Sequence, residues 1–89
     1  MRRNPEYLIR AVADRQVIVP VGAAAENFIG MIAVNVTGAY LWEKLAQEQT
    51  PDTLVEALLD KYEVTREQAL KDTLAFLEKL RAAGALIED

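Results

Sequence analysis

The sequence predicts an α+β domain of the winged helix-turn-helix type, in which a three-stranded antiparallel sheet is followed by three helices. Two observations support this prediction. The first third of the chain is rich in β-branched and aromatic residues, which favour strands, whereas the hydrophobic period becomes helical after Asn35. A run of strands followed by a run of helices is typical of an α+β fold, and 89 residues is the length of a single domain.

Three segments are expected to form the sheet: residues 7–12, 16–21 and 28–34. The first two are separated by Asp14 and Arg15, a connection short enough for a hairpin. A stretch of small residues, 22–27, leads to the third strand. That strand has no later strand to pair with, so we expect it to offer a free edge.

Each predicted helix begins at a residue suited to cap it. Asn35 precedes the first helix, Thr50 with Pro51 opens the second, and Thr65 begins a Thr-x-x-Gln capping box for the third. Gly84 is expected to end the third helix in a left-handed conformation, after which the chain can fold back onto the domain. Apolar residues cover almost half of the third helix, so we expect it to pack on two surfaces.

The residue counts exclude most catalytic and metal-binding chemistry. The chain has no His and no Cys, so it lacks the usual imidazole base, the thiolate nucleophile and the commonest ligands of transition metals. We therefore expect no metal site, no cofactor and no catalytic residue, and we predict that the chain is not an enzyme.

Charge and hydropathy indicate the cellular location of the protein and the partners that it does not bind. The net charge is −4, and the acidic excess lies in the helical part, which disfavours binding to a phosphate backbone. No apolar stretch approaches the length needed to span a bilayer, and the start has no apolar signal core. We expect a cytoplasmic protein that binds neither nucleic acid nor membrane.

A motif links the third strand to the first helix. The segment Val34-Asn35-Val36-Thr37-Gly38-Ala39-Tyr40-Leu41-Trp42 resembles the Leu-Asn-x-Thr-Gly-x-x-Ile-Trp signature of the PqqD-like family, named for pyrroloquinoline quinone (PQQ) biosynthesis protein D. The resemblance continues in residues 72–77, Leu80 and Gly84, and it covers roughly residues 30–87. This family is the stand-alone form of the peptide recognition element (RiPP recognition element) of modified-peptide biosynthesis. The resemblance implies one such domain over residues 1–89.

The resemblance also implies a function. Such a domain is a peptide chaperone that binds the leader segment of a ribosomally made precursor peptide as an added strand beside its third strand. The third helix closes the groove, and the domain presents the leader to a maturase, typically a radical S-adenosylmethionine enzyme that holds the iron–sulfur cluster. On this basis the expected peptide-binding residues are Phe28, Met31, Ile32, Ala33, Val34, Ala69, Asp72, Thr73, Phe76, Lys79 and Leu80.

The residues themselves support strand addition, because an edge strand with alternating apolar side chains offers both main-chain partners and pockets. The alternative is a winged-helix nucleic-acid-binding or transcriptional regulatory protein, which the same topology permits. Its third helix should then be basic, whereas Glu67, Asp72 and Glu78 oppose Lys71 and Lys79. A free edge strand is also compatible with a homodimer formed by strand pairing. The precursor peptide, and whether the pathway makes PQQ, are left open.

Overall fold

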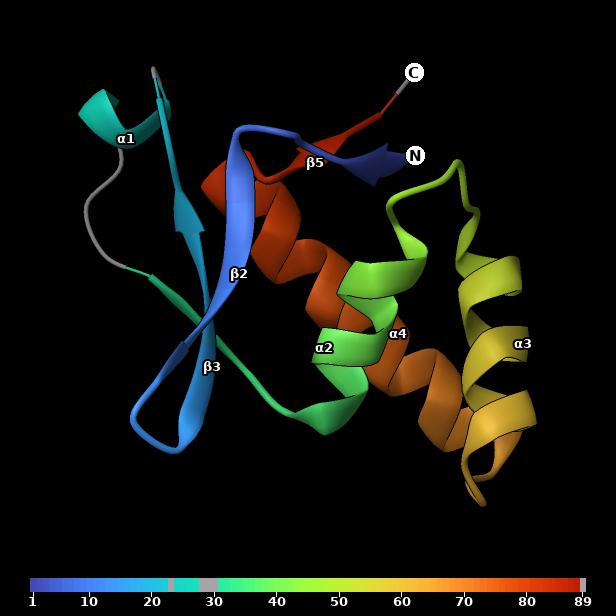
Figure 1. Cartoon of the computed structure of the whole chain (residues 1–89). Coiled ribbons are helices and arrows are strands. Elements are labelled where there is room, and N and C mark those ends of the chain that lie inside the picture. Colours follow the sequence, from blue (N-terminus) through green and yellow to red (C-terminus); the bar gives the residue numbers. More distant parts are fainter. Residues whose placement is uncertain (23, 28–30, 89) are drawn as a thin grey trace.

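The structure, a computed structural model, describes residues 1–22, 24–27 and 31–88. It has the predicted α+β architecture, with a small twisted sheet on one side and three helices packed together on the other (Figure 1). The strands of the sheet are β2 (Tyr7–Val12), β3 (Arg15–Pro20) and β4 (Ile32–Val34). The helices are α2 (Val36–Lys44), α3 (Pro51–Lys61) and α4 (Arg66–Ala83).

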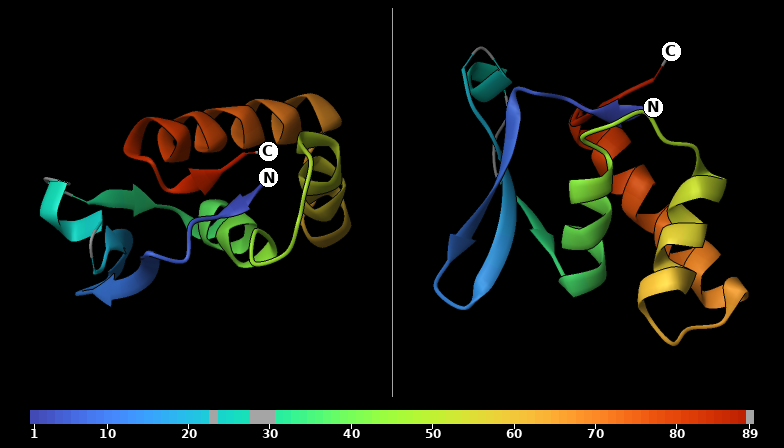
Figure 2. Two further views of the ribbon diagram at one scale, coloured as in Figure 1. Left: turned by 90° about the horizontal axis from the view of Figure 1, so that it is seen from above. Right: turned by 45° about the vertical axis from the view of Figure 1, so that its right-hand side comes forward.

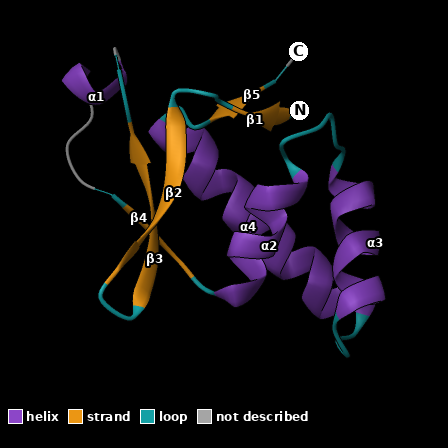
Figure 3. Ribbon diagram, viewed as in Figure 1, coloured by secondary structure: helices purple, strands orange, loops and turns teal. Residues whose placement is uncertain are grey.

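The sheet is antiparallel and ordered β2-β3-β4, so β4 is an edge strand within the described part of the chain (Figure 3). The hairpin between β2 and β3 turns at Ala13 and Asp14, with Ala13 at a φ of 58°, one residue earlier than expected. In the second pairing, Gln16 lies opposite Val34. This register brings the turn of the hairpin to the start of α2.

The chain ends pair in a second, two-stranded sheet that the sequence analysis did not predict. Strand β1 (Arg2–Arg3) lies antiparallel to β5 (Leu86–Ile87), and the two views of Figure 2 show this pair beside the C-terminal end of α4. The segment expected to be a plain connection also contains a short helix, α1 (Ala24–Asn27). The third strand was expected over residues 28–34; the structure has strand only from Ile32, and residues 28–30 lie outside the described residues.

The helix caps follow the sequence with one exception. The Asn35 side chain accepts a hydrogen bond of 2.8 Å from the Gly38 N–H, which fixes the start of α2 directly after β4. Thr65 caps α4 by accepting from the N–H of Gln68, but the Gln68 side chain donates to Asp72 instead of reaching back, so the predicted reciprocal capping box was wrong. Gly84 ends α4 at a φ of 78°, as expected.

One hydrophobic core lies between the sheet and the helices. Trp42 of α2 is 2% exposed and Ile18 of β3 is fully buried, which confirms that Trp42 is a core residue. The wide apolar face of α4 is only partly covered: Phe76 and Leu77 are buried, whereas Leu70 and Leu74 remain 41% and 49% exposed. Within the described residues, no helix is both long enough and apolar enough to cross a membrane.

Candidate functional site

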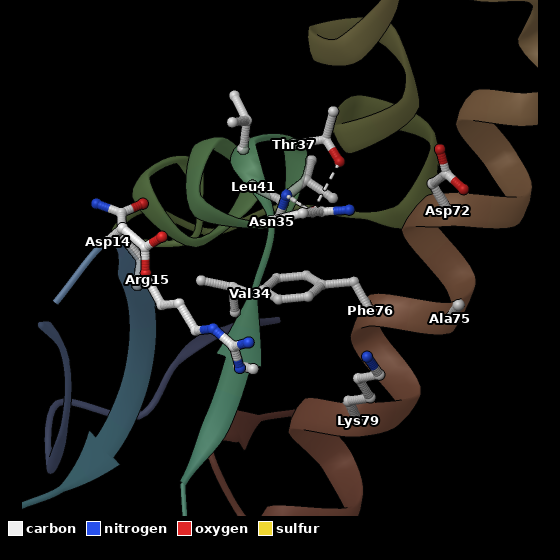
Figure 4. A pocket seen from close by; sticks show the side chains of 14 residues that line it. Asp14, Arg15, Val34, Asn35, Thr37, Leu41, Asp72, Ala75, Phe76 and Lys79 are labelled. Atoms are coloured by element: carbon white, nitrogen blue, oxygen red, sulfur yellow. Dashed lines mark hydrogen bonds between the residues drawn. The ribbon is translucent and has the colours of Figure 1, made fainter. Parts of the chain in front are cut away.

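An open groove of about 640 Å³ lies between the sheet and α4 (Figure 4). One wall comes from the end of the hairpin and from β4, and the other comes from α4, while the start of α2 closes one end. The lining residues are Asp14, Arg15, Gln16, Ala33, Val34, Asn35, Val36, Thr37, Gly38, Leu41, Asp72, Ala75, Phe76 and Lys79.

The floor of the groove is apolar and is built around Phe76. Its ring points from α4 toward Val34 of β4 (Figure 4), and the residue is 8% exposed. A Cβ placed on Gly38 would lie 3.3 Å from the Cε1 atom of Phe76. Gly38 therefore lets α2 approach the Phe76 ring of α4 closely.

One residue of β4 directs its main-chain N–H and C=O away from β3. In the hairpin turn the C=O of Val12 faces the N–H of Arg15, so the odd-numbered residues of β3 direct their main-chain groups toward β2. The hydrogen bond of 2.7 Å from the Val21 N–H to the Glu6 C=O continues this alternation. Even-numbered residues of β3 thus face β4, and Ala33, opposite Val17, is left with its N–H and C=O directed to the free edge.

Charged side chains stand on both walls. Arg15 and Lys79 are exposed, and Figure 4 shows them on either side of Val34 and Phe76. Asp72 lies nearer the start of α2 and accepts a hydrogen bond of 2.7 Å from the Gln68 amide. An apolar floor with a cation on each wall suits a ligand that is both apolar and charged.

The structure brings together five of the residues predicted from the sequence. Ala33, Val34, Asp72, Phe76 and Lys79 all line the groove. They come from one strand and from one flank of α4, so the two predicted walls do face each other.

The other predicted residues do not line the groove. Ala69, Thr73 and Leu80 are fully buried in the core and support the groove from behind. Met31 is 57% exposed beside β4, and Ile32 is partly buried against the core. Phe28 lies outside the described residues.

Several lining residues were missed as ligand contacts. Arg15 and Gln16 belong to the hairpin, and only the pairing of Gln16 with Val34 brings them to the groove. Ala75 was not predicted, although its position three residues after Asp72 and four before Lys79 places it on the same flank of α4. In the described part of the chain, no group of three His, Cys, Asp or Glu side chains is arranged to hold a metal ion.

A family comparison agrees with this geometry. The model of the family described as Coenzyme PQQ synthesis protein D (PqqD) matches residues 10–86, which include both walls of the groove. The chain belongs to the PqqD family. The resemblance seen in the motif from Val34 to Trp42 is thereby confirmed.

Solved structures share the fold of this PqqD-family chain. One is TbiB1 in complex with the TbiA(beta) leader peptide, with a TM-score of 0.73, 20% identity and full coverage (100%) of both chains. Another is a lasso peptide synthetase B1 complexed with the leader peptide, with a TM-score of 0.71 and 23% identity, covering 98% of this chain and 96% of that chain. No curated protein matches the sequence.

Proposed function

We propose that this PqqD-family chain binds the leader segment of a ribosomally made precursor peptide by strand addition to β4 and presents it to a modifying enzyme. The observation that carries the proposal is the groove itself, which runs beside a strand edge that no described residue pairs with and is closed on the other side by α4. Both similar structures are complexes with leader peptides, which supports the same class of ligand here.

Strand addition uses two separate kinds of contact. The outward N–H and C=O of Ala33 offer main-chain hydrogen bonds that any extended peptide can accept and donate. The side chains of the added strand alternate, so every second one enters the groove over Val34 and Phe76. Affinity then depends mainly on the main chain, and the choice of peptide depends on the groove.

We assign the chemistry of peptide modification to a partner. The chain has no His and no Cys, so it supplies neither the usual proton-transfer group nor thiolates for an iron–sulfur cluster. In this proposal the chain is a binding protein in the cytoplasm, and a radical S-adenosylmethionine maturase carries the cluster and acts on the presented peptide.

The other occupants considered for this surface have weaker support. A duplex would meet Glu67, Asp72 and Glu78 along α4, and neither the groove nor the comparisons favour nucleic acid. A second copy of the chain could pair with β4 and form a homodimer, and it would then compete with the peptide for the same edge. Peptide binding should therefore dissociate any dimer formed through β4.

Amide chemical-shift mapping tests the proposal. Linear peptides are first selected against the protein from a randomised library and then added to the labelled chain. The expected shifts cluster on β4 and on the flank of α4 that carries Asp72, Phe76 and Lys79. Shifts confined to α3, or shifts of α4 caused by duplex DNA and not by any peptide at physiological salt, would refute the proposal.

A further inference from the structure

Two cations face the groove without an ion-pair partner among the described residues. Arg15 and Lys79 form no ion pair with any residue that the structure describes, although both line the same groove. Some cations of the helical part are engaged: Arg66 pairs with Glu56 at 2.7 Å, and the Lys61 ammonium lies 4.3 Å from the centre of the Tyr40 ring. Lys71, which lies outside the groove, also forms no ion pair with a described residue.

A shortage of acidic residues does not explain why these two cations have no ion-pair partner among the described residues. The chain has a net charge of −4, so acids are available in excess, yet none of the described acids pairs with these two cations. Asp72 is the acid of α4 in the groove, and it is seven residues, or about 10 Å along the helix axis, from Lys79. Its carboxylate already accepts the Gln68 amide. Asp14, the other acid that lines the groove, directly precedes Arg15 but forms no ion pair with it. The two cations are therefore not neutralised by an ion pair with either acid of the groove.

We propose that the bound peptide carries an Asp or Glu side chain that lies between Arg15 and Lys79, two residues away from an apolar side chain on the Val34 and Phe76 floor. This inference rests on strand addition as the binding mode. Side chains two residues apart on a strand share a face and are separated by about 6.6 Å. Lys79 is three residues beyond Phe76, about 4.5 Å along the helix axis, and the length of the Lys79 side chain covers the difference between about 4.5 and about 6.6 Å.

The acidic side chain determines which peptides bind. A single exposed ion pair contributes little, but a carboxylate between two cations gains from both, and reversing one cation replaces an attraction with a repulsion. We expect Lys79→Glu or Arg15→Glu to weaken acidic peptides about tenfold, an effect that decreases with added salt. Both side chains are exposed, so both variants should melt like the parent.

Library selection on charge-reversed variants tests this inference. The same randomised library of linear peptides is selected against the parent, Arg15→Glu, Lys79→Glu and the matched control Lys71→Glu. Lys71 lies on the same helix, is exposed and does not line the groove. The parent and the control should enrich peptides with Asp or Glu two positions from an apolar residue, and the two groove variants should lose this preference or exchange it for Lys or Arg.

The possible failures are distinguishable. Suppose that peptides selected on the parent shift the amide signals of β4 and α4 and yet share no acidic position. This result would overturn the charge inference but would agree with strand addition. An acidic preference that persists unchanged in both groove variants has the same effect. If the parent enriches no peptide that shifts the groove, both the inference and the proposed function are wrong.

Discussion

The main-chain edge of β4 can be tested by replacing Ala33 with Pro. Because the N–H of Ala33 points to the free edge, the substitution removes a donor that an added strand would use without removing a β3–β4 hydrogen bond. Pro is tolerated on edge strands, and the β region includes its fixed φ. We therefore expect Ala33→Pro to fold with a loss of no more than about 1 kcal/mol in unfolding free energy.

The expected loss of binding follows from one main-chain bond. A hydrogen bond between neutral groups contributes about 0.5 to 1.5 kcal/mol net, which corresponds to a weakening of about 2- to 12-fold in Kd. The pyrrolidine ring also occupies the space in which the added strand would lie. We expect the affinity for a groove-binding peptide to fall by about tenfold or more, whatever the side chains of the peptide.

Titration calorimetry and thermal melting measure the two quantities separately. Ala33→Ser is the matched control, since it keeps the N–H and should bind like the parent. Ile32→Pro is the converse control, because the N–H of Ile32 faces β3 and its loss should lower stability. A folded Ala33→Pro variant that binds with the parent's affinity would show that the peptide does not pair with β4 at this residue.

Three further predictions concern stability and charge. Trp42 is 2% exposed, so Trp42→Ala should lower the unfolding free energy by about 3 to 5 kcal/mol in denaturant melts, and a variant that melts like the parent would remove Trp42 from the core. The Thr73 hydroxyl is fully buried with no hydrogen-bond partner among the described residues, so Thr73→Val should raise the unfolding free energy by about 1 kcal/mol, whereas a decrease would reveal a bond that the hydroxyl makes. A hydrogen bond from Arg81 lowers the pKa of Glu88 below its ordinary value of 4.5. The stability that ionised Glu88 contributes is therefore complete above pH 4.5 and is lost as the pH falls through the lowered pKa. An NMR titration of Arg81→Ala should show the Glu88 pKa rising again, and an unchanged pKa would contradict the assignment.

The elements that the sequence predicts correctly are those with local signals. The hairpin strands and the three long helices have a hydrophobic period and a cap or turn within a few residues of each end. Strands β1 and β5 have only two residues each, too few to show a period, and they pair residues from opposite ends of the chain, Arg2 with Ile87 and Arg3 with Leu86. Such pairing depends on the completed tertiary structure, and so the sequence analysis missed it.

The site was predicted only in part, because it too depends on contacts between segments that are distant in the sequence. Periodicity shows that Ala69, Thr73, Phe76 and Leu80 share one face of α4, but it does not show that the centre of this face is covered by the core and only its flank borders the groove. Residue size is a poor guide here, because Leu70 remains exposed on the other flank while Ala69 is fully buried. Which flank of α4 borders the groove depends on the position of β4 beside Phe76, and this position is a property of the tertiary structure.

Arg15 shows how the two kinds of recognition arise from different parts of the chain. The register that sets Gln16 opposite Val34 brings the Arg15 side chain to the groove, and the same register sets Ala33 opposite Val17, so that the main-chain groups of Ala33 face the free edge. A change at the strand edge should then weaken all peptides by a similar factor, because every peptide has the same main chain. A change at Arg15 or Lys79 should reorder the peptides and leave the affinity of an uncharged one nearly constant. Equal weakening of charged and uncharged peptides by Lys79→Glu would mean that the charge acts on the fold of the groove and not on the choice of ligand.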